Sequence, residues 1–152
     1  MSKRTTISII AFLLFVVERL TKFLALRYLS EGFFCCQKFI GLQLFHNPGI
    51  AFGLPLPTII SLAISLIIIL ALISILIKKH SRLSIWSLFA GELVVIGAIS
   101  NLLDKFYNQQ IIDFIILGRW PVFNLADVFI VLGILIIIIQ EFRKPGKIVQ
   151  KR

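Results

Sequence analysis

Long apolar runs separated by short polar segments dominate the hydrophobic pattern of the chain. Four runs are long enough to form transmembrane helices: residues 5–29, 57–77, 83–103 and 123–139. A helix needs about 20 apolar residues to cross the hydrocarbon layer, and it pairs its own backbone groups within the segment. The pattern predicts an all-α integral membrane protein with four transmembrane helices, and we treat residues 1–152 as a single membrane-embedded domain.

Two segments between the spans are predicted to lie on the outer side of the membrane. In the first, residues 30–56, Gly49, Gly53 and Pro55 punctuate short β-compatible runs. This pattern predicts a small extracytoplasmic β-element between the first and second helices. The second segment, residues 104–122, carries aromatic side chains of the kind that collect at a membrane–water interface, at Phe106, Tyr107, Phe114 and Trp120.

Composition supports a membrane protein, because 59% of the residues are hydrophobic and only 15% are charged. The net charge of +9 does not require nucleic acid as a partner. Ten of the sixteen basic residues precede the first span, separate the second from the third, or follow the fourth. Cytoplasmic segments carry such an excess of Lys and Arg. We therefore expect both termini in the cytoplasm and no nucleic-acid partner.

The motif Asn-Leu-x-Asp occurs twice in apolar surroundings, at residues 101–104 and 124–127. In the second copy, Asn124 and Asp127 have the spacing of a helix-capping box, so helix capping alone can explain them. In the first copy, Asp104 falls at the end of the third span, where the helix dipole disfavours an anion. Gly97, Asn101 and Asp104 share one helix face, and inward polar groups in a membrane indicate function.

Asp113 is the third acid predicted at the outer end of the protein, in the apolar tetrad "IIDF". A loop carboxylate is usually only solvated, but the chain returns to the membrane within fourteen residues and can bring Asp113 to Asp127. Two neighbouring carboxylates share one proton near neutral pH, so one serves as base and the other as acid. Spacing alone leaves open which two of Asp104, Asp113 and Asp127 form such a pair.

The sequence contains no motif for other common catalytic mechanisms. It has no Ser/His/Asp arrangement, no His-Glu-x-x-His and no phosphate-binding Gly loop, and His46 and His80 are predicted on opposite membrane faces. We expect no metal and no cofactor. A small proton- or ion-coupled transporter remains an alternative, because intramembrane acids also serve ion pathways.

Charged residues also lie within the first span. Glu18 and Lys22 have the i, i+4 spacing and order of a helical salt bridge, which is the simplest interpretation. The alternative is that Glu18, Arg19 and Lys22 position the outer site. Glu92, near the middle of the third span, has no partner that the sequence can name.

Four motifs together resemble the bacterial lipoprotein signal peptidases, or signal peptidase II (peptidase family A8). They are "NPGIAFGL" at 47–54, "GAISNLLDK" at 97–105, "IIDF" at 111–114 and "FNLADVFI" at 123–130, with "ERLTK" at 18–22 as a weaker match. The resemblance implies an intramembrane aspartic endopeptidase that removes signal peptides from prolipoproteins by cleaving before the diacylglyceryl-modified cysteine. Its location would be the bacterial inner membrane, with the active site near the outer face.

The resemblance also assigns residues and partners. It makes Asp113 and Asp127 the catalytic dyad. It implies that five further residues shape the site or hold the substrate: Asn47, Gly49, Asn101, Asp104 and Asn124. Membrane lipid and globomycin-type inhibitors are the other expected partners, and we expect a monomer.

Three residues depart from the family pattern. Glu18 stands where the family usually has Asp, Ser100 replaces a Gly, and Lys105 replaces an Arg whose planar fork Lys cannot reproduce. Both positions of the implied dyad are intact, so we expect an active enzyme. A catalytically inactive family member that acts as a binding protein is the remaining alternative.

Overall fold

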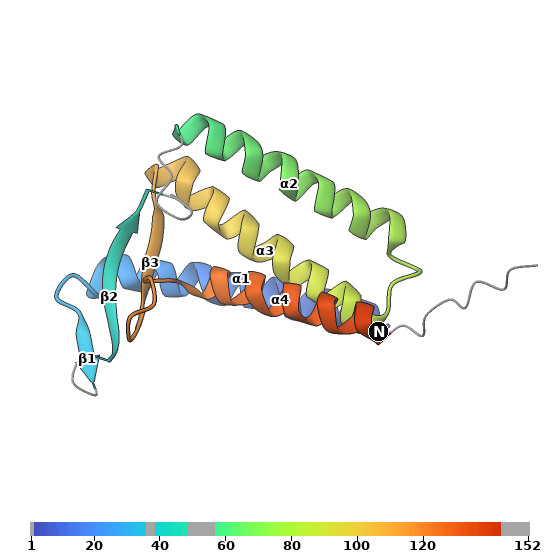
Figure 1. The fold of residues 1–152 in the computed structure, drawn as a ribbon, viewed down its shortest axis with the longest axis horizontal. Coiled ribbons are helices and arrows are strands. Elements are labelled where there is room, and N and C mark those ends of the chain that lie inside the picture. The colour runs from blue at the N-terminus through green and yellow to red at the C-terminus, as the bar shows by residue number, and fades with distance from the viewer. Residues whose placement is uncertain (1, 36–38, 49–56, 144–152) are drawn as a thin grey trace, which may run out of the picture.

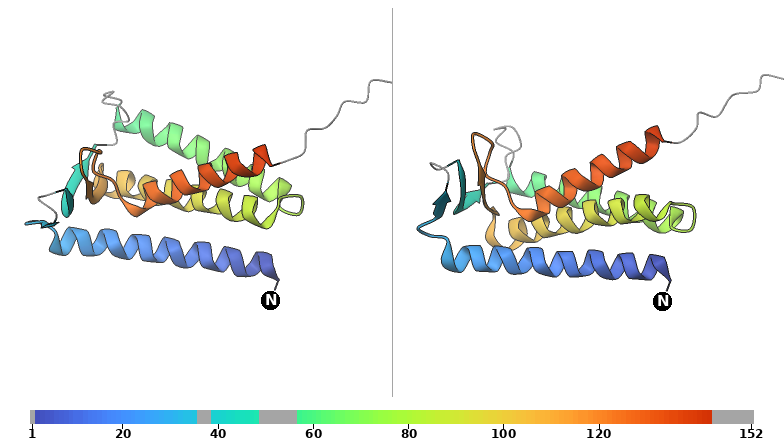
Figure 2. Two further views of the ribbon diagram at one scale, coloured as in Figure 1. Left: turned by 60° about the horizontal axis from the view of Figure 1, so that its bottom comes forward. Right: turned by 90° about the horizontal axis from the view of Figure 1, so that it is seen from below.

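The computed structural model describes residues 2–35, 39–48 and 57–143, which form a bundle of long helices with a small sheet at one end (Figure 1). The elements follow in the order α1 (Lys3–Tyr28), β1 (Phe33–Cys35), β2 (Ile40–Asn47), α2 (Thr58–Lys79), α3 (Ile85–Asn108), β3 (Ile111–Leu117) and α4 (Leu125–Phe142). The start of α1 and the end of α4 both lie at the end of the bundle remote from the sheet (Figure 2).

Within the described ranges, three helices are long and apolar enough to cross a membrane: Ile59–Lys79, Ile85–Asn108 and Leu125–Phe142. α1 has 26 residues, but Glu18, Arg19 and Lys22 interrupt its apolar sequence. The mostly helical membrane fold is therefore as predicted, while a fourth membrane-crossing helix stays a prediction.

α3 is the central helix and packs against α1, α2 and α4. Two glycines allow its close contact with α4. A Cβ on Gly97 would lie 2.5 Å from the carbonyl oxygen of Ala126, and one on Gly133 would lie 2.5 Å from that of Ala90. The expected role of Gly97, to let another helix approach Asn101 and Asp104, fits this packing.

The sheet has the order β1-β2-β3, with antiparallel pairing throughout. β1 and β2 form the β-element expected between the first two helices. The second outer segment differs from the prediction, because α3 continues to Asn108 and residues 111–117 form strand β3. The register pairs Phe45 with Asp113 and Asn47 with Ile111, so a segment between α3 and α4 completes a sheet begun before α2.

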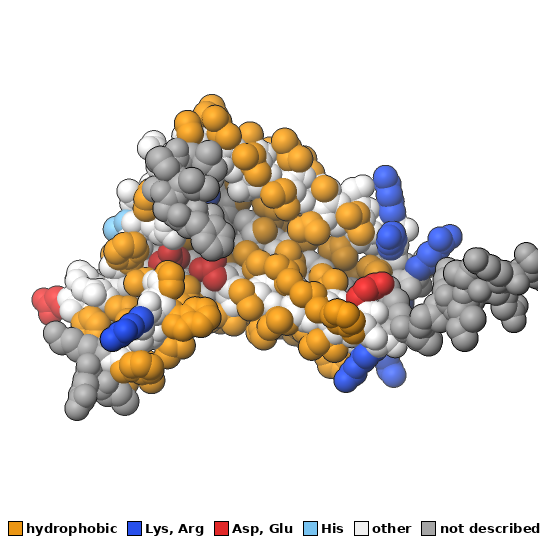
Figure 3. Space-filling model, viewed as in Figure 1, with side chains coloured by type: hydrophobic (Ala, Val, Ile, Leu, Met, Phe, Trp, Pro, Cys, Tyr) orange, Lys and Arg blue, Asp and Glu red, His pale blue; other side chains and the backbone are white. Residues whose placement is uncertain are grey.

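The surface suits a membrane. Hydrophobic side chains cover the helices along their length, and most visible Lys and Arg side chains gather at the end opposite the sheet (Figure 3). A small cluster of buried residues, Ala25, Leu29 and Phe114, joins the end of α1 to β3. The sheet is thereby fixed over one end of the bundle, where the acids of the candidate site lie.

Candidate functional site

The start of α4 fixes one carboxylate of the candidate site. Asn124 is the N-cap, and its side-chain oxygen accepts a hydrogen bond from the backbone N–H of Asp127 at 3.1 Å. In return, Oδ2 of Asp127 accepts one from the backbone N–H of Asn124 at 3.1 Å. This is the capping box that the sequence predicts, and it holds the Asp127 carboxylate at a helix N-terminus, which favours an anion.

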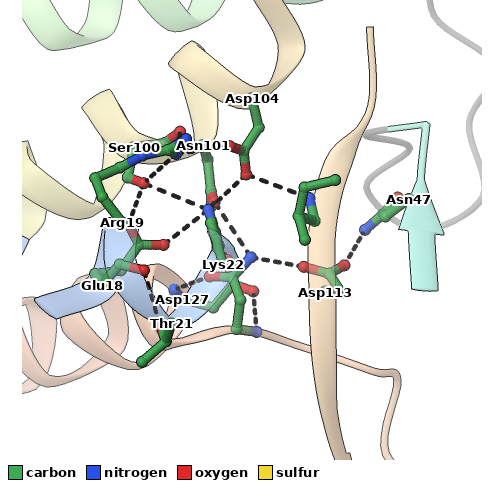
Figure 4. Close-up of polar contacts among 12 residues, drawn as sticks. Glu18, Arg19, Thr21, Lys22, Asn47, Ser100, Asn101, Asp104, Asp113 and Asp127 are labelled. Carbon is green, nitrogen blue, oxygen red and sulfur yellow. Dashed lines mark hydrogen bonds and ion pairs between the residues drawn. The ribbon is translucent and has the colours of Figure 1, made fainter. Parts of the chain in front are cut away.

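Asp113 lies on β3 with 1% of its surface exposed. Two side-chain amides donate to its carboxylate, that of Asn47 to Oδ2 at 2.8 Å and that of Asn124 to Oδ1 at 2.6 Å (Figure 4). Asn47 comes from the paired strand β2 and Asn124 from the cap of α4. Asp113 is thus held by residues that are 66 positions before it and 11 positions after it in the sequence.

The two acids face one cavity of about 460 Å³. Asp113, half-buried Asp127 and Asn47 are its polar lining residues. The rest of the wall is apolar and comes from β3, the β3–α4 connection and α4: Leu117, Trp120, Pro121, Val122, Phe123, Val128, Val131 and Leu132. The cavity therefore combines a pair of carboxylates with a large apolar surface.

Asn101 on α3 connects the hydrogen bonds around Asp127 with those around Asp113. Its amide nitrogen donates to Oδ1 of Asp127 at 2.9 Å, and its amide oxygen accepts from Asn124 at 3.2 Å. Each oxygen of both aspartates thus receives a hydrogen bond from the protein. Such a set of donors fixes the orientation of both carboxylates.

The environment of Asp113 favours its protonated form. Burial, supported by the negative charge of Asp127, raises the pKa of Asp113 from 3.8 to about 6, although the amides of Asn47 and Asn124 and the charge of Lys22 oppose the shift. Asp113 therefore keeps its proton to much higher pH than an ordinary aspartate. The raised pKa lies in the direction that a proton shared by two carboxylates requires, and a shared proton near neutral pH stays a prediction.

Asp104 is fully buried and does not line the cavity. On α3, it forms ion pairs with Arg19 at 2.6 Å and with Lys22 at 2.7 Å. Its Oδ2 also accepts a hydrogen bond from the backbone N–H of Ile112 at 3.2 Å. Of the three acids that spacing could not separate, only Asp113 and Asp127 line the cavity, whereas Asp104 pairs with two cations of α1.

The structure also shows the contacts of the other charged residues singled out in the sequence. The Glu18–Lys22 ion pair is confirmed, at 2.8 Å. Glu92 accepts a hydrogen bond from Ser8 of α1 at 2.6 Å, a partner that the sequence did not reveal. Lys105 donates to Ser61 of α2 at 2.6 Å. Gly49 lies outside the described residues.

The apolar wall of the cavity was not predicted as part of the site. Trp120 was recognised only as an interfacial aromatic, and Val128, Val131 and Leu132 were included only as part of the predicted span 123–139. Their i, i+3, i+4 spacing on the same helix as Asp127 was the available signal.

Among the described residues, no group of three or more His, Cys, Asp or Glu side chains could hold a metal ion.

Comparison with known proteins places the chain in a family. The family model described as signal peptidase (SPase) II matches residues 10–143. The lipoprotein signal peptidase of Thermodesulfovibrio yellowstonii is 32% identical over 93% of this chain and 96% of its own length. That of Rhodococcus jostii is 31% identical over 90% of this chain and 72% of its own.

Solved structures agree with the sequence comparison. One bacterial membrane enzyme superposes with a TM-score of 0.82 at 26% identity, covering 97% of this chain and 94% of that chain. A second gives 0.80 at 25% identity, covering 93% and 95%. The chain belongs to the signal peptidase II family and is a membrane protein of the peptidase class.

Proposed function

We propose that this protein is an aspartic endopeptidase that removes signal peptides from lipoprotein precursors, with Asp113 and Asp127 as its catalytic dyad. The observation that carries the proposal is the pair itself: two hydrogen-bonded carboxylates face one apolar-walled cavity. Its relatives named lipoprotein signal peptidase support the substrate class.

The chemistry follows from one proton held between two carboxylates. The ionised aspartate accepts a proton from a water molecule, and the resulting hydroxide-like oxygen attacks the scissile carbonyl carbon. The protonated aspartate donates to the carbonyl oxygen, and a proton then passes to the leaving amine. We assign the proton to Asp113 in the resting enzyme, because burial raises its pKa to about 6. The amides of Asn47, Asn101 and Asn124 keep the carboxylates in position for both transfers.

The apolar wall suits a lipid-modified substrate. Val128, Val131 and Leu132 extend the cavity along α4 away from the acids. In this proposal the diacylglyceryl chains and the signal peptide lie along the bilayer, and the bond before the modified cysteine reaches the dyad. Globomycin-type inhibitors would occupy the same cavity.

The proposed topology puts the site at the outer face of the bacterial inner membrane. Four helices cross the membrane, α1 included, and both termini are cytoplasmic. The basic residues at the end opposite the sheet support this orientation. Lys22 forms ion pairs with Glu18 and Asp104, so the charges of α1 are balanced within the bundle. Residues 1–152 act as one domain and as a monomer.

The test is cleavage of a diacylglyceryl-modified precursor by purified protein, with the product identified by mass. We expect Asp113→Asn and Asp127→Asn each to abolish cleavage while the helix content stays unchanged. Glu31→Gln is the matched control, since it makes the same carboxylate-to-amide change at an exposed outer residue. Full activity in either dyad variant, or a product with a different new N-terminus, contradicts the proposal.

A further inference from the structure

Lys22 is a fully buried cation with oxygen atoms of four residues around its ammonium group, Oγ of Ser100 being the most distant at 3.4 Å (Figure 4). The nitrogen Nζ lies 2.8 Å from Oε1 of Glu18, 2.7 Å from Oδ2 of Asp104 and 2.9 Å from Oδ1 of Asn101. A lysine ammonium has three N–H donors and no acceptor. The ammonium group is thus surrounded by two carboxylates and further polar oxygens, and one of these, Oδ1 of Asn101, belongs to the network around the dyad.

The contact with Asn101 fixes the direction of that amide together with Asn124, whose amide nitrogen donates to the same oxygen at 3.2 Å. Because Lys22 can only donate, the oxygen of the Asn101 amide must face Lys22, and the amide nitrogen must face the other way. There it donates to Oδ1 of Asp127 at 2.9 Å. Turning the amide over would bring its N–H groups against the ammonium and its oxygen against the Asp127 carboxylate.

The contact with Asp104 reaches the other member of the dyad. The oxygen that pairs with Lys22, Oδ2, also accepts the backbone N–H of Ile112, the residue before Asp113. A buried carboxylate persists in its ionised form only when cations and donors surround it. Lys22 therefore supports the anchor that holds β3 beside Asp113.

We propose that Lys22 is a positioning residue for the dyad: it orients the Asn101 amide toward Asp127 and supports the Asp104 anchor of the strand that carries Asp113. The inference rests on the proposed function, because it needs Asp113 and Asp127 to be the reacting acids. Lys22 itself does not line the cavity, so it acts through Asn101 and Asp104.

The cluster must be altered in charge-balanced pairs. Glu18, Asp104, Lys22 and Arg19 carry two negative and two positive charges, and removal of one partner leaves a buried charge uncompensated. E18Q/K22M removes one charge of each sign. The amide oxygen that this double variant introduces can still accept the hydrogen bond that Ser100 donates to Glu18.

E18Q/R19M is the matched control. Like E18Q/K22M, it removes one charge of each sign and one of the two cations paired with Asp104. It leaves Lys22 on Asn101, since the contacts of Arg19 are with Asp104 and Ser100, so the two pairs differ at Asn101. General damage to the cluster should affect both pairs alike. A positioning role should affect the Lys22 pair far more.

The experiment measures kcat and KM for a diacylglyceryl-modified precursor, with thermal unfolding in detergent as the measure of folding. We expect E18Q/K22M to lower kcat about 30-fold or more with KM changed less than about threefold, and E18Q/R19M to keep kcat within about fivefold. Adding Asn101→Ala to E18Q/K22M should lower kcat less than about threefold further, because the loss of Lys22 already weakens the hydrogen bond from Asn101 to Asp127 that this change removes.

The inference is overturned if E18Q/K22M keeps kcat within about threefold of wild type, or if both pairs lose kcat equally. Should E18Q/K22M lack a cooperative unfolding transition, E18M/K22M takes its place with the same expected values. D113N and D127N are measured in parallel. If they remain active, the proposed function fails; if they are inactive while E18Q/K22M is active, only the role of Lys22 fails.

Discussion

Asp113 should make the stability of the folded protein depend on pH with an unusual sign. Burial raises its pKa from 3.8 to about 6, so the folded protein binds this proton more tightly than the unfolded chain does. The stability that the proton contributes is complete below the unfolded pKa and is lost as pH rises through about 6. Most paired aspartates behave in the opposite way, because their pKa is lowered on folding.

The magnitude follows from the size of the shift. A difference of about 2 pKa units corresponds to about 3 kcal/mol between the two protonation states. Part of this is already lost at pH 4.5, so about 2 kcal/mol remains to be lost between pH 4.5 and pH 8. Asp113 is 1% exposed, so solvent screening does not reduce this value substantially.

The assay is reversible unfolding in mixed detergent micelles between pH 4.5 and 8, for wild type and Asp113→Asn. The variant lacks the titrating group, so subtracting its profile removes the contribution of groups common to both proteins. The unfolding free energy of wild type should fall relative to Asp113→Asn by about 2 kcal/mol as pH rises. The exposed-site variant Glu31→Gln should follow the wild-type profile. A wild-type profile that stays level or rises relative to Asp113→Asn refutes the reasoning.

Substitutions at two further positions test the helix cap beside the dyad and the packing of α3 against α4. Asn124→Ala removes the N-cap of α4 and a donor to Asp113, whereas Asn124→Ser keeps a capping oxygen. Both variants should lose cleavage, but the Ala variant should be about 1 kcal/mol less stable to unfolding than the Ser variant in the same micelles. Equal stability of the two variants would contradict the capping role. Gly97→Val should destabilise the protein by about 2 kcal/mol or more, because a Cβ there meets the carbonyl oxygen of Ala126 at 2.5 Å; unchanged unfolding would show that α3 and α4 do not pack this closely.

Sequence reasoning identified the features that local pattern controls. Apolar runs located all four long helices, with ends shifted by five residues or fewer, and Asn-Leu-Ala-Asp indicated the capping box of α4. The ion pair of Glu18 and Lys22 followed from helical spacing. Each of these depends on residues that are close in the sequence, where periodicity and propensity are informative.

Features that depend on distant partners were not predictable in the same way. β3 pairs with β2 across the whole of α2 and α3, so its seven residues read only as an apolar segment without a helix. The choice among Asp104, Asp113 and Asp127 depends on which carboxylates face the cavity. Spacing does not contain that information, and before the structure only the family resemblance made the choice.

The most direct test of the dyad is the single-turnover rate of precursor cleavage by wild type, D113N, D127N and the double variant. Two residues that act as one unit give non-additive losses. Each single variant should lose at least about 1,000-fold in rate, and the double variant should be no slower than the singles. A folded single variant within about tenfold of wild type would contradict the assignment of Asp113 and Asp127 as the reacting pair.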